Sequence, residues 1–268
     1  MRRADISTNC VVLLALLLSS VAGFTQQSHI GKLTGNAKQG KALYRRYCIF
    51  CHGSYGDGTG ENAPYMDPKP RDFTKATFKC RSTPSGSLPL DNDLYDTISR
   101  GVHGSGMPSW KALTRQQRAD LVAYIKTFSS RFEEEKPAAG LEIPPAPPNS
   151  VESAKHGAEL FESMNCWSCH GREGRGNGPN ARTLTDSKGF PIVPFDLTSG
   201  IHLKCGDSDQ AIFRDLMTGL DGTPMPSFSD AVKPEEAWDL VHYIETLRVS
   251  GKKTGQAKAE PKTEPKGE

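Results

Sequence analysis

The side chains of this chain that are best suited to bind a redox cofactor fall into two motifs with the same spacing. Each motif has two cysteines separated by two residues and a histidine directly after the second cysteine: Cys48, Cys51 and His52, then Cys166, Cys169 and His170. This is the attachment pattern of a c-type haem. The two thiols add to the porphyrin vinyl groups, and the histidine faces the iron as an axial ligand. The sequence therefore predicts two covalently bound haem c groups.

A zinc site is the alternative interpretation of two Cys-x-x-Cys pairs. It leaves both histidines unexplained, and it expects the two pairs to lie much closer together in the sequence.

The second axial ligand of each iron is predicted to be a methionine. Met107 lies 55 residues after His52, and Met225 lies 55 residues after His170. Each is followed by proline, in a loop rich in glycine or proline, whereas an ordinary core methionine needs no such setting. A thioether ligand raises the reduction potential and suits electron transfer. His103, four residues before Met107, is the alternative ligand at the first site.

The two motifs lie at the head of two similar segments, and the haem motifs and the Met-Pro pairs are each offset by 118 residues, with compensating insertions and deletions between them. Residues 37–44 correspond to residues 154–161, and both stretches favour an amphipathic helix that leads into the first cysteine. Further matches are Asp72-Phe73-Thr74 with Asp196-Leu197-Thr198, and Lys79-Cys80 with Lys204-Cys205. This correspondence indicates an internal duplication.

Each copy is predicted to close with a helix. The first would begin at Thr114, which forms a capping-box pattern with Gln117, and the second would begin with Pro234 as its first residue. No segment favours a strand. The predicted fold class is all-α, with a few helices and long loops around each haem.

The predicted organisation has five parts. They are a signal peptide at 1–24, a first domain at 35–131, a proline-rich linker at 132–152, a second domain at 153–249 and a disordered tail at 250–268. The linker contains five prolines and is expected to be extended and semi-rigid. The tail offers almost nothing to bury.

The first residues have the features of a secretory signal. Arg2 and Arg3 precede an apolar run at 11–18, and small residues up to Ala22 suit cleavage. The run is too short to cross a bilayer, which needs about 20 residues. We therefore expect a periplasmic mature protein without a transmembrane anchor.

The charge balance excludes nucleic-acid binding as an expected function. The formal net charge is +2, and removing residues 1–22 takes away Arg2, Arg3 and Asp5, which lowers the charge to +1. No basic stripe with interleaved aromatic residues is present.

Each copy resembles a class I cytochrome c domain in its N-terminal helix, haem motif, glycine loop, Met-Pro loop and C-terminal helix. The resemblance covers residues 35–130 and 152–248, and the whole chain resembles the two-domain dihaem bacterial cytochromes c. It implies that Tyr44 and Phe161 pack near the crossing of the terminal helices. It also implies that Pro64 and Pro179 support the axial histidines through backbone contacts.

One further cysteine stands in each copy, Cys80 and Cys205, at corresponding positions. Once the signal peptide is removed, these are the only cysteines outside the haem motifs. In an oxidising compartment such a remaining pair suggests a disulfide. Two buried thiols and a cysteine axial ligand remain as alternatives.

The expected function is that of an electron carrier and not an enzyme. Its partners would be a redox protein that donates electrons and another that accepts them, and it could be the cytochrome subunit of a larger respiratory complex. The alternative is a catalytic dihaem enzyme of the peroxidase or thiosulfate-oxidising type, which needs an iron with an open coordination position beside acid or base groups.

Overall fold

The structure of the chain, a computed structural model, describes the backbone of residues 26–257 and the side chains of residues 26–248. The predicted signal peptide at 1–24 and residues 258–268 of the predicted tail lie outside the described residues. The elements in chain order are β1 (Gln27–Ile30), β2 (Leu33–Asn36), α2 (Ala37–Tyr47), α3 (Ile49–His52), η1 (Ala63–Tyr65), α4 (Asp91–Arg100), α5 (Arg115–Lys126), α6 (Arg131–Glu134), α7 (Val151–Ser163), α8 (Trp167–His170), η2 (Ala181–Thr183), α9 (Asp209–Thr218) and α10 (Pro234–Ala257).

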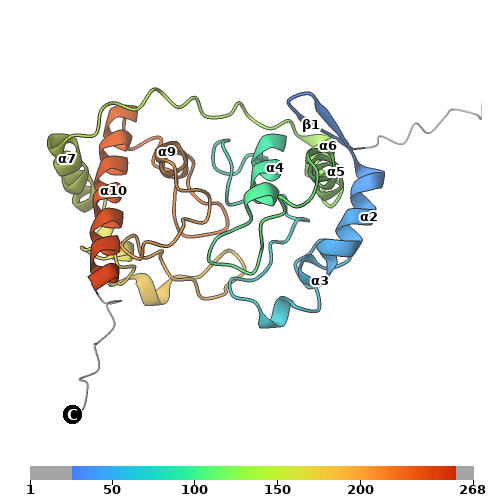
Figure 1. Cartoon of the computed structure of the whole chain (residues 1–268), viewed down its shortest axis with the longest axis horizontal. Helices are drawn as coiled ribbons and strands as arrows, with labels where there is room; N and C mark the ends of the chain where they lie inside the picture. Colours follow the sequence, from blue (N-terminus) through green and yellow to red (C-terminus); the bar gives the residue numbers. More distant parts are fainter. Residues whose placement is uncertain (1–25, 258–268) are drawn as a thin grey trace, which may run out of the picture.

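The elements form two halves that lie side by side, with α2, α4 and α5 in one half and α7, α9 and α10 in the other (Figure 1). The strands are few and short, so the predicted all-α class is confirmed. No helix within the described residues is both long and apolar enough to cross a membrane.

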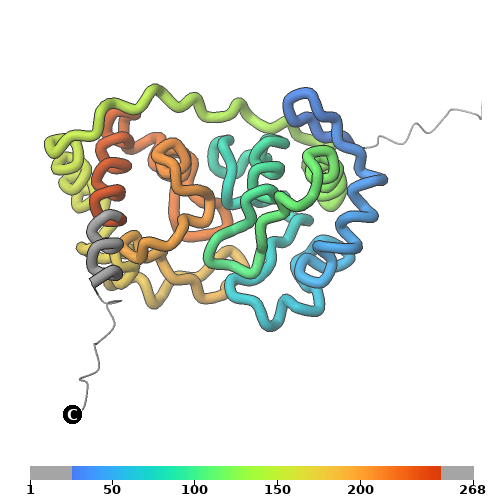
Figure 2. The backbone as a smooth tube through the Cα atoms, viewed as in Figure 1, coloured from blue at the N-terminus to red at the C-terminus, as the bar shows by residue number. Residues whose placement is uncertain are grey.

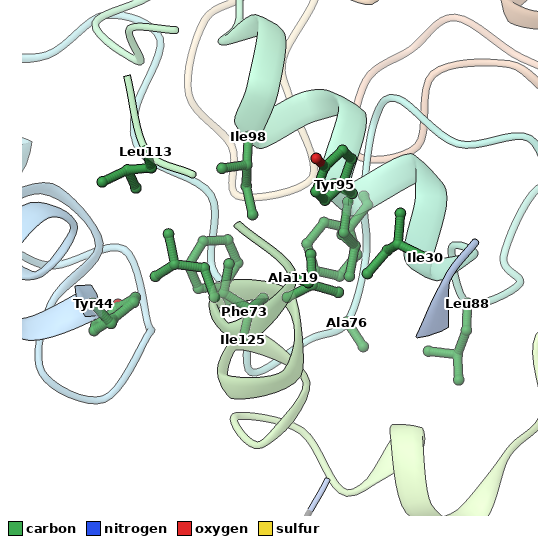
Figure 3. Close-up of a cluster of buried hydrophobic side chains, with 14 residues drawn as sticks. Ile30, Tyr44, Phe73, Ala76, Leu88, Tyr95, Ile98, Leu113, Ala119 and Ile125 are labelled. Atoms are coloured by element: carbon green, nitrogen blue, oxygen red, sulfur yellow. The ribbon is translucent and has the colours of Figure 1, made fainter. Parts of the chain in front are cut away.

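Each half has a hydrophobic core of its own. The first core, drawn in Figure 3, gathers side chains such as Tyr44 from α2, Phe73 from a loop and Ile125 from α5. The second gathers Phe161 from α7 and Trp238 from α10, among others. Two separate cores are what two independently stabilised domains require.

The terminal helices of each half cross at a glycine. A Cβ built on Gly40 of α2 would lie 2.0 Å from the carbonyl oxygen of Asp120 in α5, and one on Gly157 of α7 would lie 2.0 Å from that of Asp239 in α10. The two backbones can approach this closely only where the side chain is a hydrogen atom. Tyr44 and Phe161 lie one helical turn later, against Tyr124 and Tyr243 respectively. These contacts agree with the packing that the resemblance implied.

The predicted starts of the two closing helices are confirmed. Thr114 and Gln117 form the capping box of α5, in which the Gln117 amide donates to the Thr114 hydroxyl at 3.2 Å and the Thr114 amide donates to the Gln117 side chain at 2.9 Å. Helix α10 begins at Pro234.

The prediction that the chain contains no strand is wrong for residues 27–36, where β1 and β2 pair antiparallel. The pair is stabilised by tertiary contacts with α5. The buried Ser28 hydroxyl donates to the Ala119 carbonyl at 2.7 Å, and the Asn36 amide donates to the Asp120 carboxylate at 2.8 Å. Ile30 also joins the first core, so this half begins before residue 35.

The backbone of α10 continues to Ala257, into the range of the predicted tail at 250–268, and the disorder of that tail stays a prediction. Extending an existing helix costs far less than starting one, and no proline occurs after Pro234 until Pro261. Low hydrophobicity alone therefore does not end this helix.

The segment between α6 and α7 contains neither helix nor strand and runs along one edge of the molecule (Figure 2). It contacts both halves. The Leu141 amide donates to the Ser82 carbonyl at 2.7 Å, and the side chains of Leu141 and Ile143 pack against the second core. The exact domain and linker boundaries remain a prediction.

Candidate functional sites

Both Cys-x-x-Cys-His motifs lie on one helical turn that follows a terminal helix. In the first, Cys48 is the residue after α2 and His52 ends α3, with the His52 amide bonded to the Cys48 carbonyl at 2.9 Å. In the second, the His170 amide bonds to the Cys166 carbonyl at the same distance. Residues three and four positions apart share one face of a helix, so each turn presents two thiols and an imidazole to the same side.

The motif cysteines form no disulfides. The first pair belongs to the first half and the second pair to the second half, where Cys48 and Cys166 pack against different cores. This placement does not fit a single zinc site built from both pairs. Burial raises the pKa of Cys48 to about 12 and that of Cys166 to about 11.

A backbone carbonyl orients each motif histidine. The Nδ1 of His52 lies 3.0 Å from the carbonyl oxygen of Arg71, and the Nδ1 of His170 lies 3.1 Å from that of Phe195. A carbonyl oxygen only accepts, so Nδ1 carries the proton and Nε2 is left to bind a metal. Burial lowers the pKa of both imidazoles and favours their neutral form.

The two prolines expected to support these histidines do not do so by hydrogen bonding. Pro64 and Pro179 are exposed, and the accepting carbonyls belong to Arg71 and Phe195. The accepting segment is brought back to the motif by the glycine loop, where the amides of Phe73 and Leu197 bond to Gly56 and Gly174 at 2.6 and 2.7 Å.

A sequence signal for these carbonyls was present in the repeated Asp-x-Thr. Asp72 accepts from the amide and hydroxyl of Thr74, and Asp196 does the same with Thr198. Each of these turns starts directly after the accepting carbonyl and fixes its direction.

The two candidate methionine ligands lie in loops with the same hydrogen bonds. The Met107 carbonyl accepts from the Val102 amide and the Met225 carbonyl from the Leu220 amide, both at 3.1 Å. The Met107 and Met225 amides donate to the hydroxyls of residues 105 and 223, both at 3.2 Å. The side chains of Met107 and Met225 pack against the same cores as Cys48 and Cys166.

A cavity of about 370 Å³ in the second half brings the predicted residues together. Its lining includes Cys166, Cys169, His170 and Met225. The rest of the lining is mainly apolar, and the volume is within the range of small-molecule and cofactor sites. A haem c has an apolar macrocycle, two thiol attachment points and an iron that takes histidine and methionine ligands. The residues that line this cavity therefore fit that cofactor.

The first half places the corresponding groups around aromatic side chains. Phe73 stacks on the His52 ring with 4.4 Å between ring centroids, and Tyr47 lies 5.3 Å from Trp110 at the end of the Met107 loop. The buried Tyr44 hydroxyl donates to the Gly53 carbonyl at 2.8 Å and fixes the residue after the motif.

A disulfide joins Cys80 to Cys205, with 5.2 Å between the Cα atoms, and it connects the two halves. The alternatives for these cysteines were a disulfide, two buried thiols and an axial ligand, and the structure contains the disulfide. Directly after it, the buried Arg81 donates to the Thr218 carbonyl at 2.7 Å and pairs with Asp221 at 2.8 Å, both in the other half.

His103, the alternative ligand at the first site, contacts the other half. Its ring lies 4.7 Å from that of His202, which in turn bonds to Asp207. Its exposure is intermediate.

Two family models match the chain, one over each half. Residues 35–125 match the family described as cytochrome c oxidase, cbb3-type, subunit III. Residues 154–248 match the family described as cytochrome c.

Similar curated proteins include the cbb3-type cytochrome c oxidase subunit FixP of Azorhizobium caulinodans, which is 24% identical over 78% of this chain. The quinohemoprotein alcohol dehydrogenase ADH-IIG of Pseudomonas putida is 26% identical over 58% of this chain and 20% of its own length. The chain spans 59% of the length of FixP.

A solved structure with the same fold comes from the reducing HAO-like protein complex of Kuenenia stuttgartiensis. It is 44% identical, with a TM-score of 0.77, and the match covers 78% of this chain and 96% of the other. The likeness therefore extends over both halves.

Proposed function

The chain belongs to the cytochrome c family and carries two cytochrome c domains in tandem, and from this premise we propose that it is a dihaem electron-transfer protein. Cytochrome c domains bind haem c covalently, and the bound haem supplies an iron that alternates between two oxidation states. Cys48 and Cys51 would hold one haem, and Cys166 and Cys169 the other.

The observation that carries the proposal is that both halves position a histidine and a methionine in the same way. His52 and His170 present Nε2 because a carbonyl holds Nδ1. Met107 and Met225 lie in loops with matching hydrogen bonds. His52 with Met107 and His170 with Met225 would each hold one haem iron, and a methionine thioether would suit that iron to electron transfer.

The chain also limits water and proton chemistry at the second site. The cavity is lined mainly by apolar side chains, and its one carboxylate, Asp215, forms an ion pair with Arg214 at 2.7 Å. A catalytic dihaem enzyme needs an acid or base beside an open iron, and the pairing of the one carboxylate in this lining favours the carrier.

The two halves are connected at fixed positions. Electron transfer between two haems needs such a fixed arrangement of the domains. The Cys80–Cys205 disulfide and the Arg81–Asp221 ion pair both join them. We propose that electrons enter through one domain and leave through the other.

We further propose a periplasmic location, with redox proteins as donor and acceptor. The signal-like residues 1–24 motivate the location. FixP is named as an oxidase subunit, and the Kuenenia structure is of a protein complex. By analogy, this chain would act as the cytochrome subunit of a larger respiratory complex, and its co-purification with other redox proteins from the native source would test this.

The haem count and axial ligands can be tested together on the holoprotein. Intact mass should show two haems. Met107→Ala should lower the potential of one haem and Met225→Ala that of the other, because a thioether favours the reduced iron. Each variant should also lose part of the weak sulfur-to-iron absorption band.

Met66→Ala is the matched control, since the Met66 side chain lies against Gly106 in the first methionine loop. It should leave both potentials unchanged. A protein with fewer than two haems, or a Met107→Ala variant with unaltered spectrum and potential, would refute the proposed sites. Ready binding of carbon monoxide by the reduced wild-type protein would favour the catalytic alternative.

A further inference from the structure

The lining of the cavity in the second half includes a lysine from the first half. Lys79 belongs to the segment that precedes the interdomain disulfide, and it lines the cavity beside Cys205 and the second-half residues. It is one of few charged residues in a lining that is otherwise mainly apolar. A cation from one domain is thus exposed to the cofactor site of the other.

The second lysine in this lining is already engaged. Lys204, which corresponds to Lys79 in the duplication, donates to the Gly104 carbonyl of the first methionine loop at 3.0 Å. In contrast, Lys79 has no hydrogen bond or ion pair from its ammonium to any residue in the described part of the chain. Asp215, the carboxylate of the lining, pairs with Arg214.

The electrostatic setting of Lys79 suits an anion. Burial lowers its pKa to about 8, and the positive charges of Arg71 and Lys204 lower it in addition. Lys79 is half-buried, and an ammonium withdrawn from water is unfavourable unless an anion or several acceptors compensate it. The Arg71 guanidinium also reaches the second half, where it lies against Gly222 in the loop before Met225.

We propose that Lys79 of the first domain is the cationic partner of the acidic edge of the haem held in the second domain. The inference rests on the proposed haem binding, because the two propionates are the acidic groups of that cofactor. The second site is then built by both domains. Lys79 is a positioning and tuning residue, and its positive charge favours the reduced state of the second haem.

The test replaces Lys79 in the disulfide-intact holoprotein and measures both reduction potentials, with Met225→Ala used to assign the second. Lys79→Gln should lower the second potential so that the ratio of reduced to oxidised haem falls by about tenfold, which for one electron equals about 59 mV. The first potential should change much less. Lys79→Arg should restore the wild-type values because it keeps the charge.

Lys75→Gln is the matched control, because Lys75 is exposed in the same segment and the charge change is identical. It should leave both potentials unaltered. If Lys79→Gln carries two haems by mass and its second potential equals that of the wild type, the inference is refuted while the proposed function stands. If the wild-type protein carries no second haem, both are refuted.

Discussion

At the residue scale, Tyr44 and Phe161 show how one hydroxyl distinguishes two otherwise similar sites. Both rings are buried beside the helix crossing. Tyr44 donates to the Gly53 carbonyl directly after the first motif, whereas Phe161 offers no such donor in the second half. The first site therefore has a hydrogen bond between its helix and the residue after the motif, and the second site lacks the corresponding donor.

Tyr44→Phe should weaken the first half alone. It leaves the buried Gly53 carbonyl without this donor, at a cost of about 1–3 kcal/mol. Hydrogen exchange measured on peptides from α2 and α5 should become faster, and peptides from α7 and α10 should be unaffected. Tyr55→Phe, at a ring that is 78% exposed, should leave the exchange rates of both halves unchanged. Equally faster exchange in both halves of the Tyr44→Phe variant would contradict the prediction that this hydrogen bond stabilises the first half alone.

At the element scale, the fold depends on two close helix crossings, α2 with α5 and α7 with α10. Each crossing places a helical glycine against a backbone carbonyl of the partner helix. The turns that carry the two Cys-x-x-Cys-His motifs follow α2 directly and α7 after two residues. The position of each motif is therefore set by the packing of the helix before it.

Gly40→Ala and Gly157→Ala should each destabilise one half. Inside a helix this change normally stabilises by about 1 kcal/mol. Here the added Cβ would lie 2.0 Å from a carbonyl oxygen, and forced overpacking costs about 1–3 kcal/mol or more. Gln39→Ala on the exposed face of α2 is the control.

The direction of the change in the free energy of unfolding tests this prediction. Urea unfolding followed by circular dichroism should show a loss of stability for both glycine variants and no loss for the control. A gain in stability for Gly40→Ala would mean that the two helices do not cross at this distance.

At the scale of the whole molecule, the interface between the halves carries buried charge as well as a disulfide. Arg81 is 0% exposed, and its guanidinium reaches the Thr218 carbonyl and the Asp221 carboxylate of the other half. Asp221 also accepts from the Ser85 hydroxyl and the Gly86 amide. The two halves are thus connected by a network in which each charge has partners.

Arg81→Met should destabilise the chain strongly even with the disulfide intact. Removing one partner of a buried ion pair costs about 3–5 kcal/mol, because the other charge is left uncompensated. The free energy of unfolding in urea measures this loss. Arg131→Met, which breaks the exposed pair with Glu135, should show no comparable loss, and equal effects of the two substitutions would contradict a buried interface.

The disulfide gives a second prediction at this scale. Native holoprotein, alkylated under denaturing conditions, should show no reactive thiol before reduction and two after it. The bridge spans 125 residues of sequence, and a loop of this size contributes about 4–5 kcal/mol in the chain-entropy model. The Cys80→Ser, Cys205→Ser double variant should therefore unfold at lower urea and let the two haem potentials respond less to each other. Two thiols alkylated without reduction would disprove the bridge.

The sequence alone determined the chemistry that depends on local spacing. The haem motifs, the helices that lead into them, the capping box at Thr114 and the start of α10 all follow from residues a few positions apart, and the structure agrees on the helices. Short-range patterns are sufficient there because one helical turn fixes which side chains share a face.

Only the tertiary structure decided the contacts between distant segments. The carbonyls that orient His52 and His170 belong to the backbone, so no residue type in the sequence marks them. Pro64 and Pro179, which the resemblance suggested for this role, do not supply them. The β1–β2 pair depends on α5. The placement of Lys79 in the cavity of the other half depends on how the two domains dock, and no pattern within a single copy encodes that contact.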